Sequence, residues 1–384
     1  MRVVTVAGTR PELIKLAPLV PLLDERFEST YLFTGQHYSP SMVQIFLDEL
    51  DARPPDRFLD VGSSDLKALT QATTAAFRVI APDIVLTYGD TNSTLAAALA
   101  ARALGVPMLH IEGGIRSFDR SMPEEVNRVK VDAIAALRLA PTGLATWFLT
   151  AFEGLAAATC PAVGNLVVDA WRRHRPLIDA RPAPAIESPY AVLTMHRQAT
   201  VDDPVVFARA LAELSAIDLP ILFPVHPRTQ ARLDSFGLSW PANIRACAPL
   251  GYLDFCRAMS GATVLLTDSG GVQEEAISLD IPCVTLRPNT ERMETVFLGA
   301  NRLFDLHRDV GLAGLAARAV EQHAQRPYRM NPFGDGRAAE RIVAILELMD
   351  DREPSVTFEP APGIAGLEAL RAAAEQVRQG QGQT

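Results

Sequence analysis

The feature that most constrains the fold of this chain is a repeated order of short apolar run, polar loop and helical pattern. Val3–Ala7 is a β-branched run that ends in Gly8, and residues 13–23 follow it with helical spacing. Similar apolar runs occupy residues 30–34, 84–88 and 107–111. Short, wholly apolar runs indicate parallel strands buried on both faces. Their alternation with helices predicts a doubly wound α/β sheet.

A second series of the same kind begins at residue 190. Its apolar runs lie at residues 190–194, 221–225, 263–267 and 283–286, after a proline-rich stretch. We therefore predict two Rossmann-like domains, at 1–170 and 171–350. Residues 351–384 form an extension rich in Ala, Gln and Gly, for which we expect one helix at 364–379 and a disordered tail.

Composition narrows the class of protein. The 384 residues suffice for two domains, and the net charge of −9 argues against a nucleic-acid partner, which needs clustered Lys and Arg. No apolar run reaches the roughly 18 residues that a membrane-spanning helix requires. The four cysteines are widely spaced and form no CxxC pair, which fits a reducing cytoplasm and no membrane partner.

Polar residues follow nearly every predicted strand, and ligands of such sheets bind at the carboxyl ends of the strands. In the second half, Ser269, Gly270 and Gly271 open a helix, where backbone N–H groups and the helix dipole suit a diphosphate. Glu275, one turn further, is placed to accept from ribose hydroxyls. An ordinary capped strand–helix turn would give the same Ser-Gly-Gly string.

The first half carries the ionisable groups. Arg10 and Lys15 follow the first strand and could hold a phosphate, unless they are solvated surface cations. Asp90, Glu112 and Glu124 could place three carboxylates in one site, where crowding separates their acid and base roles. Simple helix N-terminal charge is the alternative for Glu124.

Two histidines end neighbouring strands of the second half. His196 and His226 are candidate acid/base groups near neutral pH, and structural hydrogen bonding is the alternative for each. The sequence contains no GxxxxGK[ST], no GxGxxG after the first strand, no HExxH and no DxD. The residues thus predict a site for an anionic phosphorylated ligand without a metal.

A set of short strings occurs in one order over about residues 3–340. They are GTRPE, TGQH, YGDTNSTLA, HIEGGIRS, MPEEVNR, GN at 164–165, MHR, VHPRT, LGYLDF, DSGGVQEEA and LRPNTER. In these strings the chain resembles the non-hydrolysing UDP-N-acetylglucosamine 2-epimerases. The resemblance implies a glycosyltransferase-B-like architecture, a UDP-amino sugar as substrate, no cofactor and a homodimer.

The resemblance also implies roles for residues. Asp90, Glu112 and Glu124 resemble the acid/base carboxylates, and His196 resembles the histidine beside the leaving diphosphate. The matched substrate-binding positions are Arg10, Lys15, Arg128, His226, Phe255, Ser269, Gly270, Gly271, Glu275 and Arg292. The implied reaction inverts C2 by eliminating UDP to a 2-acetamidoglucal and adding UDP back.

Some positions depart from the family pattern. Gln198 and Ala199 replace the acidic run after His196, and Met293 stands where proline is usual. Gln36 and His37 match part of an allosteric UDP-GlcNAc site of bacterial members, but Ser63-Ser64-Asp65 replaces its Arg-Gln pair, which argues against that regulation. The alternatives are a 2-epimerase of UDP-2,3-diacetamido-uronates, a hydrolysing 2-epimerase, a glycosyltransferase or an inactive nucleotide-sugar binder.

Overall fold

The computed structural model describes residues 1–36, 47–325, 330–358 and 363–381. The chain divides into two compact units, residues 1–173 with 332–384 and residues 174–331. Among the described residues, no helix combines the length and apolarity needed to cross a membrane.

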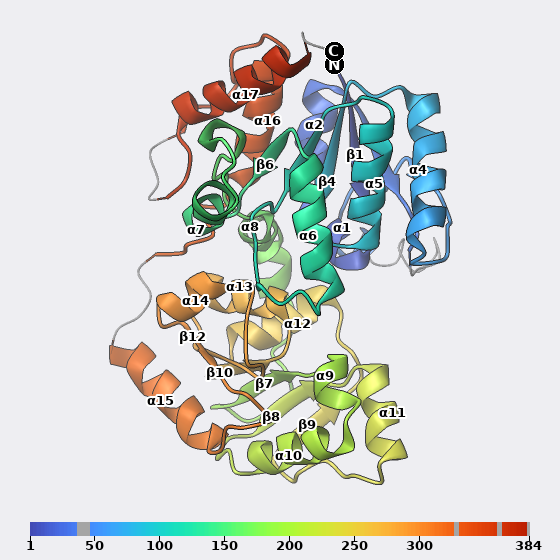
Figure 1. Cartoon of the computed structure of the whole chain (residues 1–384). Helices are drawn as coiled ribbons and strands as arrows, with labels where there is room; N and C mark the ends of the chain where they lie inside the picture. Colours follow the sequence, from blue (N-terminus) through green and yellow to red (C-terminus); the bar gives the residue numbers. More distant parts are fainter. Residues whose placement is uncertain (37–46, 326–329, 359–362, 382–384) are drawn as a thin grey trace. The chain divides into compact units, whose positions relative to one another are not determined.

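The first unit is built on a parallel six-stranded sheet of order β3-β2-β1-β4-β5-β6 (Figure 1). Its strands are β1 (Arg2–Ala7), β2 (Glu28–Phe33), β3 (Arg57–Phe58), β4 (Ile84–Tyr88), β5 (Met108–Ile111) and β6 (Leu137–Leu139). Its helices are α1 (Arg10–Leu16), α2 (Val20–Arg26), α4 (Leu66–Ile80), α5 (Asn92–Ala103), α6 (Pro123–Ile134), α7 (Gly143–Trp147), the start of α8 (Leu166–Asp179), α16 (Ala338–Met349) and α17 (Leu367–Gln381). A π-helical turn (Phe148–Phe152) and a 3₁₀ turn (Ala157–Thr159) follow α7.

Helices cover both faces of this sheet. On one face, α4, α5 and α6 pack side by side, with Phe77, Ala97 and Val131 against Val4 and Val85 of the strands. On the other face, α16 packs against α2 and α17 (Figure 1). Every residue of β4 and β5 is buried, which explains their unbroken apolar runs.

The second unit repeats the plan with a parallel sheet of order β12-β11-β10-β7-β8-β9. Its strands are β7 (Ala191–Thr194), β8 (Ile221–Pro224), β9 (Ile244–Cys247), β10 (Val264–Thr267), β11 (Cys283–Thr285) and β12 (Asn301–Leu303). Its helices are the end of α8, α9 (Gln198–Val201), α10 (Pro204–Ser215), α11 (Pro227–Ser235), α12 (Tyr252–Ser260), α13 (Gly270–Ser278), α14 (Met293–Phe297) and α15 (Leu312–Gln325).

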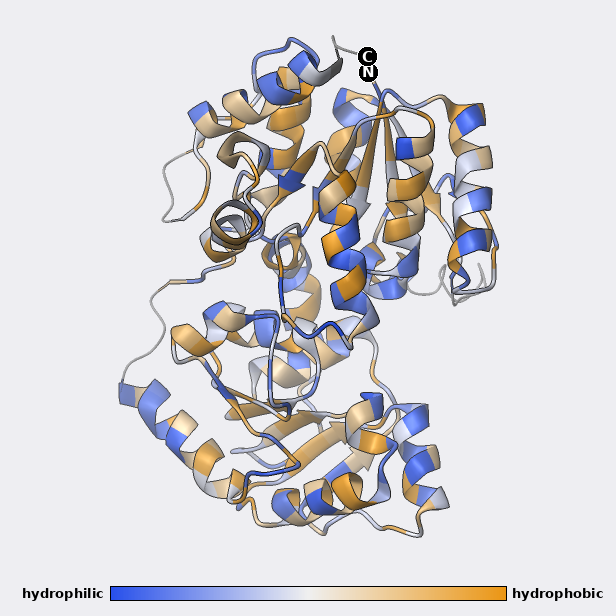
Figure 2. Ribbon diagram, in the orientation of Figure 1, coloured by the Kyte–Doolittle hydropathy of each residue, from blue (hydrophilic) through white to orange (hydrophobic). Residues whose placement is uncertain are grey.

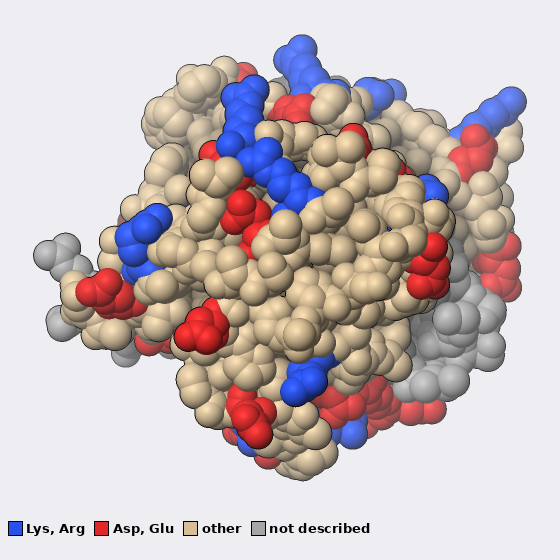
Figure 3. Space-filling view, turned by 90° about the horizontal axis from the view of Figure 1, so that it is seen from below, with Lys and Arg blue, Asp and Glu red and all other residues tan. Residues whose placement is uncertain are grey.

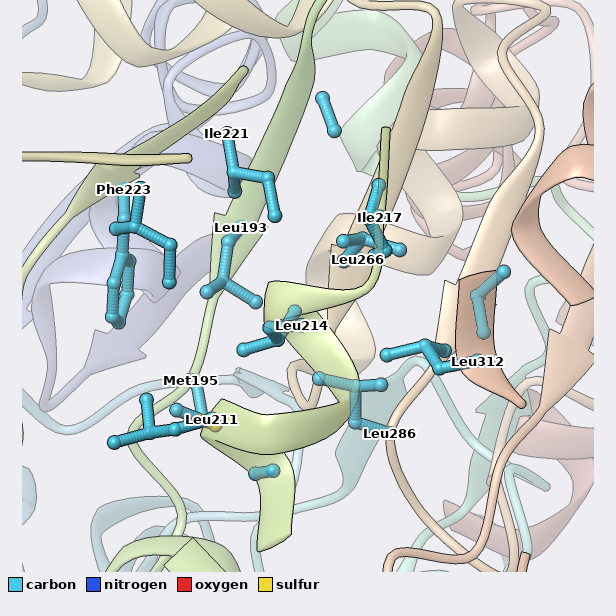
Figure 4. Close-up of a cluster of buried hydrophobic side chains, with 14 of the residues drawn as sticks. Leu193, Met195, Leu211, Leu214, Ile217, Ile221, Phe223, Leu266, Leu286 and Leu312 are labelled. Atoms are coloured by element: carbon cyan, nitrogen blue, oxygen red, sulfur yellow. The ribbon is translucent and has the colours of Figure 1, made fainter. Parts of the chain in front are cut away.

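The core of the second unit lies between its sheet and helices α10 and α15. Leu193, Phe223 and Leu266 from the strands meet Leu214 of α10 and Leu312 of α15 (Figure 4). Figure 2 shows the same distribution along both sheets, whose strands are coloured as apolar while many helices carry one polar side. The predicted fold class of two Rossmann-like units is confirmed.

The boundaries of the units differ from the expected ones. The chain leaves the first unit inside α8, after Arg173, and residues 332–350 return to the first unit. The cause lies in α16: Asp169 accepts hydrogen bonds from Ala338 N (3.2 Å) and Ala339 N (2.9 Å), and Phe333 O accepts from Asn165 N (2.8 Å). These contacts join segments about 170 residues apart, so no local sequence pattern predicts them.

The C-terminal extension is part of the first unit. Its helix α17 covers Leu367–Gln381, close to the expected range, and packs on α16. Leu370, Ala373 and Ala374 are fully buried in that contact. The last residues of the expected tail, 382–384, lie outside the described residues.

Candidate active site

The strand order of each unit creates one place where neighbouring loops diverge. In the first unit β1 and β4 are paired at the centre of the sheet, and their following elements lead to opposite edges. The second unit has the same point between β7 and β10. Ligands of doubly wound sheets bind at such points, outside the carboxyl ends of the strands. Arg10 and Asp90 follow β1 and β4, and His196 and Asp268 follow β7 and β10.

Glu112 is a buried carboxylate with three side-chain hydrogen-bond donors on one oxygen. It directly follows β5, has a φ of 75° and is 8% exposed. Its Oε1 accepts hydrogen bonds from the Tyr88 hydroxyl (2.9 Å), Lys15 Nζ (3.3 Å) and Asn165 Nδ2 (3.5 Å). Three donors on one oxygen, one of them an ammonium, stabilise the ionised carboxylate. Lys15, an expected substrate-binding residue, thus forms an ion pair with Glu112 in this structure.

Asp90 is held by an arginine. Arg128 Nη2 donates to Asp90 Oδ2, and Arg128 Nη1 donates to Glu125 Oε2 at 3.0 Å. Asn127 Nδ2 donates to the backbone oxygen of Asp90 at 3.0 Å. The Asp90 side chain remains 25% exposed, whereas that of Arg128 is only 6% exposed. In this structure Arg128, an expected substrate-binding residue, orients the carboxylate of Asp90.

Two neighbouring acids at the start of α6 have different environments. Glu124 is exposed, and no hydrogen bond of its side chain occurs among the described residues. Glu125 is buried and accepts from Ser117 N (2.9 Å) and Phe118 N (3.0 Å). Glu125 therefore fixes the loop after β5, and Glu124 is the one of the two that solvent reaches.

A buried ionic network supports the loops that carry Asp90 and Glu112. His110 Nδ1 lies 2.6 Å from Asp132 Oδ1, and His110 Nε2 lies 2.8 Å from the backbone oxygen of Gly89. Asp132 Oδ2 accepts from Gly114 N (3.0 Å) and pairs with Arg116 (2.7 Å). Burial by itself would raise the pKa of Asp132, but His110 and Arg116 outweigh it and lower this pKa to about 2. Asp132 therefore remains ionised and ties both loops to α6.

The loop after β1 is closed by a buried acid. Glu12 Oε2 accepts from Gly8 N (2.5 Å) and Thr9 N (3.0 Å). Burial raises the pKa of Glu12 to about 7, against the lowering effect of these hydrogen bonds, and the charge of Asp90 adds to the rise. Arg10, the first residue of α1, is half-buried beside this turn.

Of the two residues matched to an allosteric site, the structure describes only Gln36. Gln36 is buried, and its side-chain oxygen accepts from Ser93 Oγ (2.8 Å) and Ser93 N (3.3 Å). These bonds join Gln36 to the start of α5. His37 lies outside the described residues.

In the second unit, a buried aspartate organises the loop after β7. Asp268 is fully buried, and its Oδ2 accepts from His196 N and Arg197 N, both at 2.8 Å. The His196 ring is 43% exposed, with Nδ1 3.6 Å from Asp268 Oδ1. The ring of His226 lies beside it, 5.7 Å between centroids. The two predicted histidines are therefore neighbours.

His226 has a defined hydrogen bond. Its Nδ1 accepts from Arg228 N at 3.1 Å, as the N-cap of α11, which leaves Nε2 as the protonated nitrogen of the neutral ring. Partial burial, followed by the charges of His196 and Arg228, lowers the pKa of His226. The ring is therefore neutral near pH 7 and presents an N–H donor.

The glycine pair that opens α13 divides into two roles. A Cβ at Gly270 would lie 2.2 Å from Glu291 Oε1, whereas a Cβ at Gly271 would meet no atom within 4 Å. Ser269 is the N-cap, with no side-chain hydrogen bond to the helix. Gly270 is therefore needed for packing against Glu291, and the backbone at Gly271 is open to the approach of a ligand.

Another acidic pair lies in α13. Glu274 is fully buried and its Oε1 lies 2.5 Å from Arg292 Nε, whereas Glu275 is half-buried. Arg292, an expected ligand of the sugar–phosphate, is 6% exposed and is held against Glu274. Phe255, expected to flank the base, is half-buried on α12.

Four residues that organise the site were not among the expected ones: Tyr88, Asp132, Asn165 and Asp268. Tyr88 and Asp268 end or follow the central strands, so their position in the strand pattern was a usable signal. Asp132 lies three turns into α6 and Asn165 precedes α8. Asn165 belongs to the GN string at 164–165, which was a usable signal, whereas Asp132 lies in no string singled out in the sequence and meets its partners only through the fold.

Two Rossmann-like units, with strand-end carboxylates in one and a Ser-Gly-Gly helix start in the other, are the arrangement expected of a protein that binds a phosphorylated ligand. The family model described as UDP-N-acetylglucosamine 2-epimerase matches residues 23–347. A UDP-N-acetylglucosamine 2-epimerase of Methanocaldococcus jannaschii is 37% identical over 90% of this chain and 99% of its own length. The chain therefore belongs to the UDP-N-acetylglucosamine 2-epimerase family.

Other relatives extend this result. The M. jannaschii enzyme in complex with UDP-GlcNAc and UDP has a TM-score of 0.80 at 38% identity, covering 90% of this chain and 99% of that one. A UDP-2,3-diacetamido-2,3-dideoxy-D-glucuronate 2-epimerase of Pseudomonas aeruginosa is 34% identical over 90% of this chain and 99% of its length. The similarity of fold confirms the glycosyltransferase-B-like architecture implied by the resemblance, and the family is one of epimerases.

Proposed function

We propose that this chain interconverts UDP-GlcNAc and UDP-ManNAc by inverting C2 of the sugar. The observation that carries the proposal is the Glu112 carboxylate at the end of β5, held by Tyr88 and Lys15 in a chain of this family. The M. jannaschii relative, which binds UDP-GlcNAc and UDP, supports this choice of substrate.

The proposed reaction has two balanced halves. A carboxylate takes the C2 proton, the C–H electron pair forms the C1–C2 double bond, and UDP leaves with the electrons of the C1–O bond. A protonated acid then returns a proton to the other face of C2, and the UDP oxygen attacks C1. We assign this acid/base work to Asp90, Glu112 and Glu124 of the first unit. This sequence of steps needs no redox cofactor, because only protons and UDP are removed and returned.

We assign UDP binding to the second unit. The N-terminus of α13 at Ser269, Gly270 and Gly271 would take the diphosphate, with backbone N–H groups as donors. His196 would stand beside the leaving diphosphate. Glu275 and Phe255 would contact ribose and uracil, and His226 and Arg292 would complete the site, together with Arg10 and Lys15 of the first unit.

A UDP-diacetamido-uronate is the second candidate substrate, because the P. aeruginosa relative is named as a 2-epimerase of that sugar. The chemistry at C1 and C2 would be the same, and only the C3 and C6 substituents would differ. Turnover of that sugar in preference to UDP-GlcNAc would move the assignment to this second candidate.

We further propose a homodimer in the cytoplasm. The four cysteines are free thiols, as expected in a reducing compartment. On the face shown in Figure 3, Lys and Arg occur together with Asp and Glu among uncharged residues. Sedimentation of the purified chain would test the dimer.

The decisive measurement is proton NMR of the protein with UDP-GlcNAc in heavy water. We expect a second UDP-sugar anomeric signal and deuterium at C2. Glu112→Gln should lower turnover by at least about 100-fold, as loss of a general acid or base does, whereas Glu25→Gln on the exposed side of α2 should not. Free UDP with N-acetylmannosamine would indicate a hydrolysing enzyme, and transfer to an added acceptor would indicate a glycosyltransferase. Binding without any turnover would indicate an inactive binder.

A further inference from the structure

Tyr88 contacts both members of the Glu112–Lys15 ion pair of the first unit. It is the last residue of β4 and is paired in register with Ile111, the residue before Glu112. This register brings its side chain, 3% exposed, to the Glu112 carboxylate, where the hydroxyl donates to Oε1 at 2.9 Å. This hydrogen bond is the shortest of the three that Oε1 accepts from Tyr88, Lys15 and Asn165.

The ring of Tyr88 contacts the cation of the same pair. Lys15 Nζ lies 5.2 Å from the ring centroid and 3.3 Å from Glu112 Oε1. An ammonium over the face of an aromatic ring is attracted by the ring quadrupole, most strongly where water is excluded. One side chain thus contacts the Glu112 carboxylate through its hydroxyl and the Lys15 ammonium through its ring.

We propose that Tyr88 is a positioning residue, which holds the Glu112–Lys15 pair so that Glu112 enters the reaction as an oriented, ionised base. The inference rests on the proposed function, since it names how one carboxylate of that site is prepared. Tyr88 does not touch the reacting atoms in this scheme and acts through Glu112 alone.

Other charged groups around Glu112 act on different atoms. His110 of β5 and Asp132 of α6 hold the backbone of Gly89 and Gly114. Arg138 of β6 donates to the backbone oxygen of Asp132, and Arg128 of α6 pairs with Asp90. Tyr88, Lys15 and the Asn165 amide donate to Oε1, so removal of the Tyr88 hydroxyl changes the hydrogen bonds of the carboxylate itself.

The test is Tyr88→Phe, which removes only the hydroxyl. Loss of a hydrogen bond to a charged group should lower kcat about 10-fold, with KM nearly unchanged, and move the acidic limb of the pH–rate profile to higher pH. Tyr31→Phe is the matched control, because the buried Tyr31 hydroxyl of β2 has no hydrogen-bond partner among the described residues. It should leave both the rate and the profile as in the wild type.

A second measurement does not depend on turnover. In protein labelled with ¹³C at the glutamate carboxyls, the Glu112 signal is assigned by its loss in Glu112→Gln. Its titration midpoint should rise by about one pH unit in Tyr88→Phe. In the Glu112→Gln background, Tyr88→Phe should change the residual rate by less than about twofold, because the two changes act through one group.

The outcomes separate this inference from the proposed function. An unchanged midpoint in Tyr88→Phe overturns the inference even if epimerisation is normal. An equal loss of rate in the Glu112→Gln background also overturns it, since Tyr88 would then act by another route. Absence of turnover in the wild type would count against the proposed function, while a raised midpoint would still support the role of Tyr88.

Discussion

Acidic pairs in this chain show how neighbouring residues acquire opposite environments. Glu124 and Glu125 are adjacent in α6, and Glu274 and Glu275 are adjacent in α13. Consecutive helical residues point about 100° apart, so one member of each pair is buried against an arginine and the other is more exposed. The buried members are Glu125, beside Arg128, and Glu274, beside Arg292. The sequence shows both acids, and only packing decides which one is bound by an arginine.

The acid that caps the first loop gives a prediction on stability. The folded-state pKa of Glu12 is about 7, above its ordinary value of 4.5, so the folded protein binds the proton more tightly. Its contribution to stability is complete below pH 4.5 and is lost as the pH rises through 7. The loss is about 3 kcal/mol. The Glu12→Gln side chain does not titrate, so this variant should not show the pH-dependent loss of stability.

Denaturant unfolding at pH 5 and pH 8 would measure this difference. The free energy of unfolding of the wild type minus that of Glu12→Gln should fall by about 2.5 kcal/mol between pH 5 and pH 8, because at pH 5 the unfolded carboxyl is already mostly ionised. Other groups that titrate in this range, such as Asp169 with its pKa raised by burial to about 6, cancel in the comparison. A difference that is the same at both pH values would contradict the assignment of the proton to Glu12.

At the scale of elements, the ends of strands and the starts of helices place the site. The turn between β10 and α13 combines an N-cap at Ser269, a glycine packed under Glu291 and a glycine facing open space. Glu291 is itself fixed by Arg287, whose Nη2 donates to Oε2 at 2.9 Å. Because Glu291 cannot move freely, the two glycines of this turn respond differently to the same added methyl group.

Alanine substitutions should separate these two roles. Gly270→Ala should destabilise the second unit by about 1–3 kcal/mol, the usual cost of overpacking, because Cβ would collide with Glu291. Gly271→Ala should leave stability unchanged or slightly higher, since alanine favours the helix, and should weaken UDP binding. Thermal unfolding and calorimetric titration with UDP would measure both effects. Equal loss of stability in the two variants would contradict the division.

At the scale of the whole molecule, the chain distributes its chemistry between two units with the same strand order. The first unit holds the carboxylates with their cations, and the second holds the glycine-opened helix. The first unit is completed by the C-terminal part of the chain, since Asp169 accepts hydrogen bonds from the start of α16 and α17 packs on α16. Because we assign diphosphate binding to the start of α13 and proton transfer to the carboxylates, substitutions at Gly271 and at Glu112 should have different effects.

Ligand-induced stabilisation tests this division. UDP at about 100 times its Kd should raise the free energy of unfolding by about 2.7 kcal/mol. Glu112→Gln, in the first unit, should retain this increase although it loses turnover. Gly271→Val, in the second unit, should abolish the increase by crowding the helix start. Thermal unfolding with and without UDP would check both, and loss of the increase in Glu112→Gln would argue against separate roles.

The sequence by itself determined the class of fold and placed the candidate site residues at the carboxyl ends of the strands. The period of the hydrophobic pattern, the strand length and the glycine positions are local properties. The apolar runs Val3–Ala7 and Ile84–Tyr88 therefore predict strands, and Gly8 and Gly89 mark where these strands end. Ordered motifs likewise sufficed for the family. Tertiary structure alone decided which groups meet: Tyr88 with Glu112, His110 with Asp132, and Asp169 with α16. These contacts join residues from about 20 to 170 positions apart, where the pairing is fixed by sheet order and side-chain packing rather than by any local pattern.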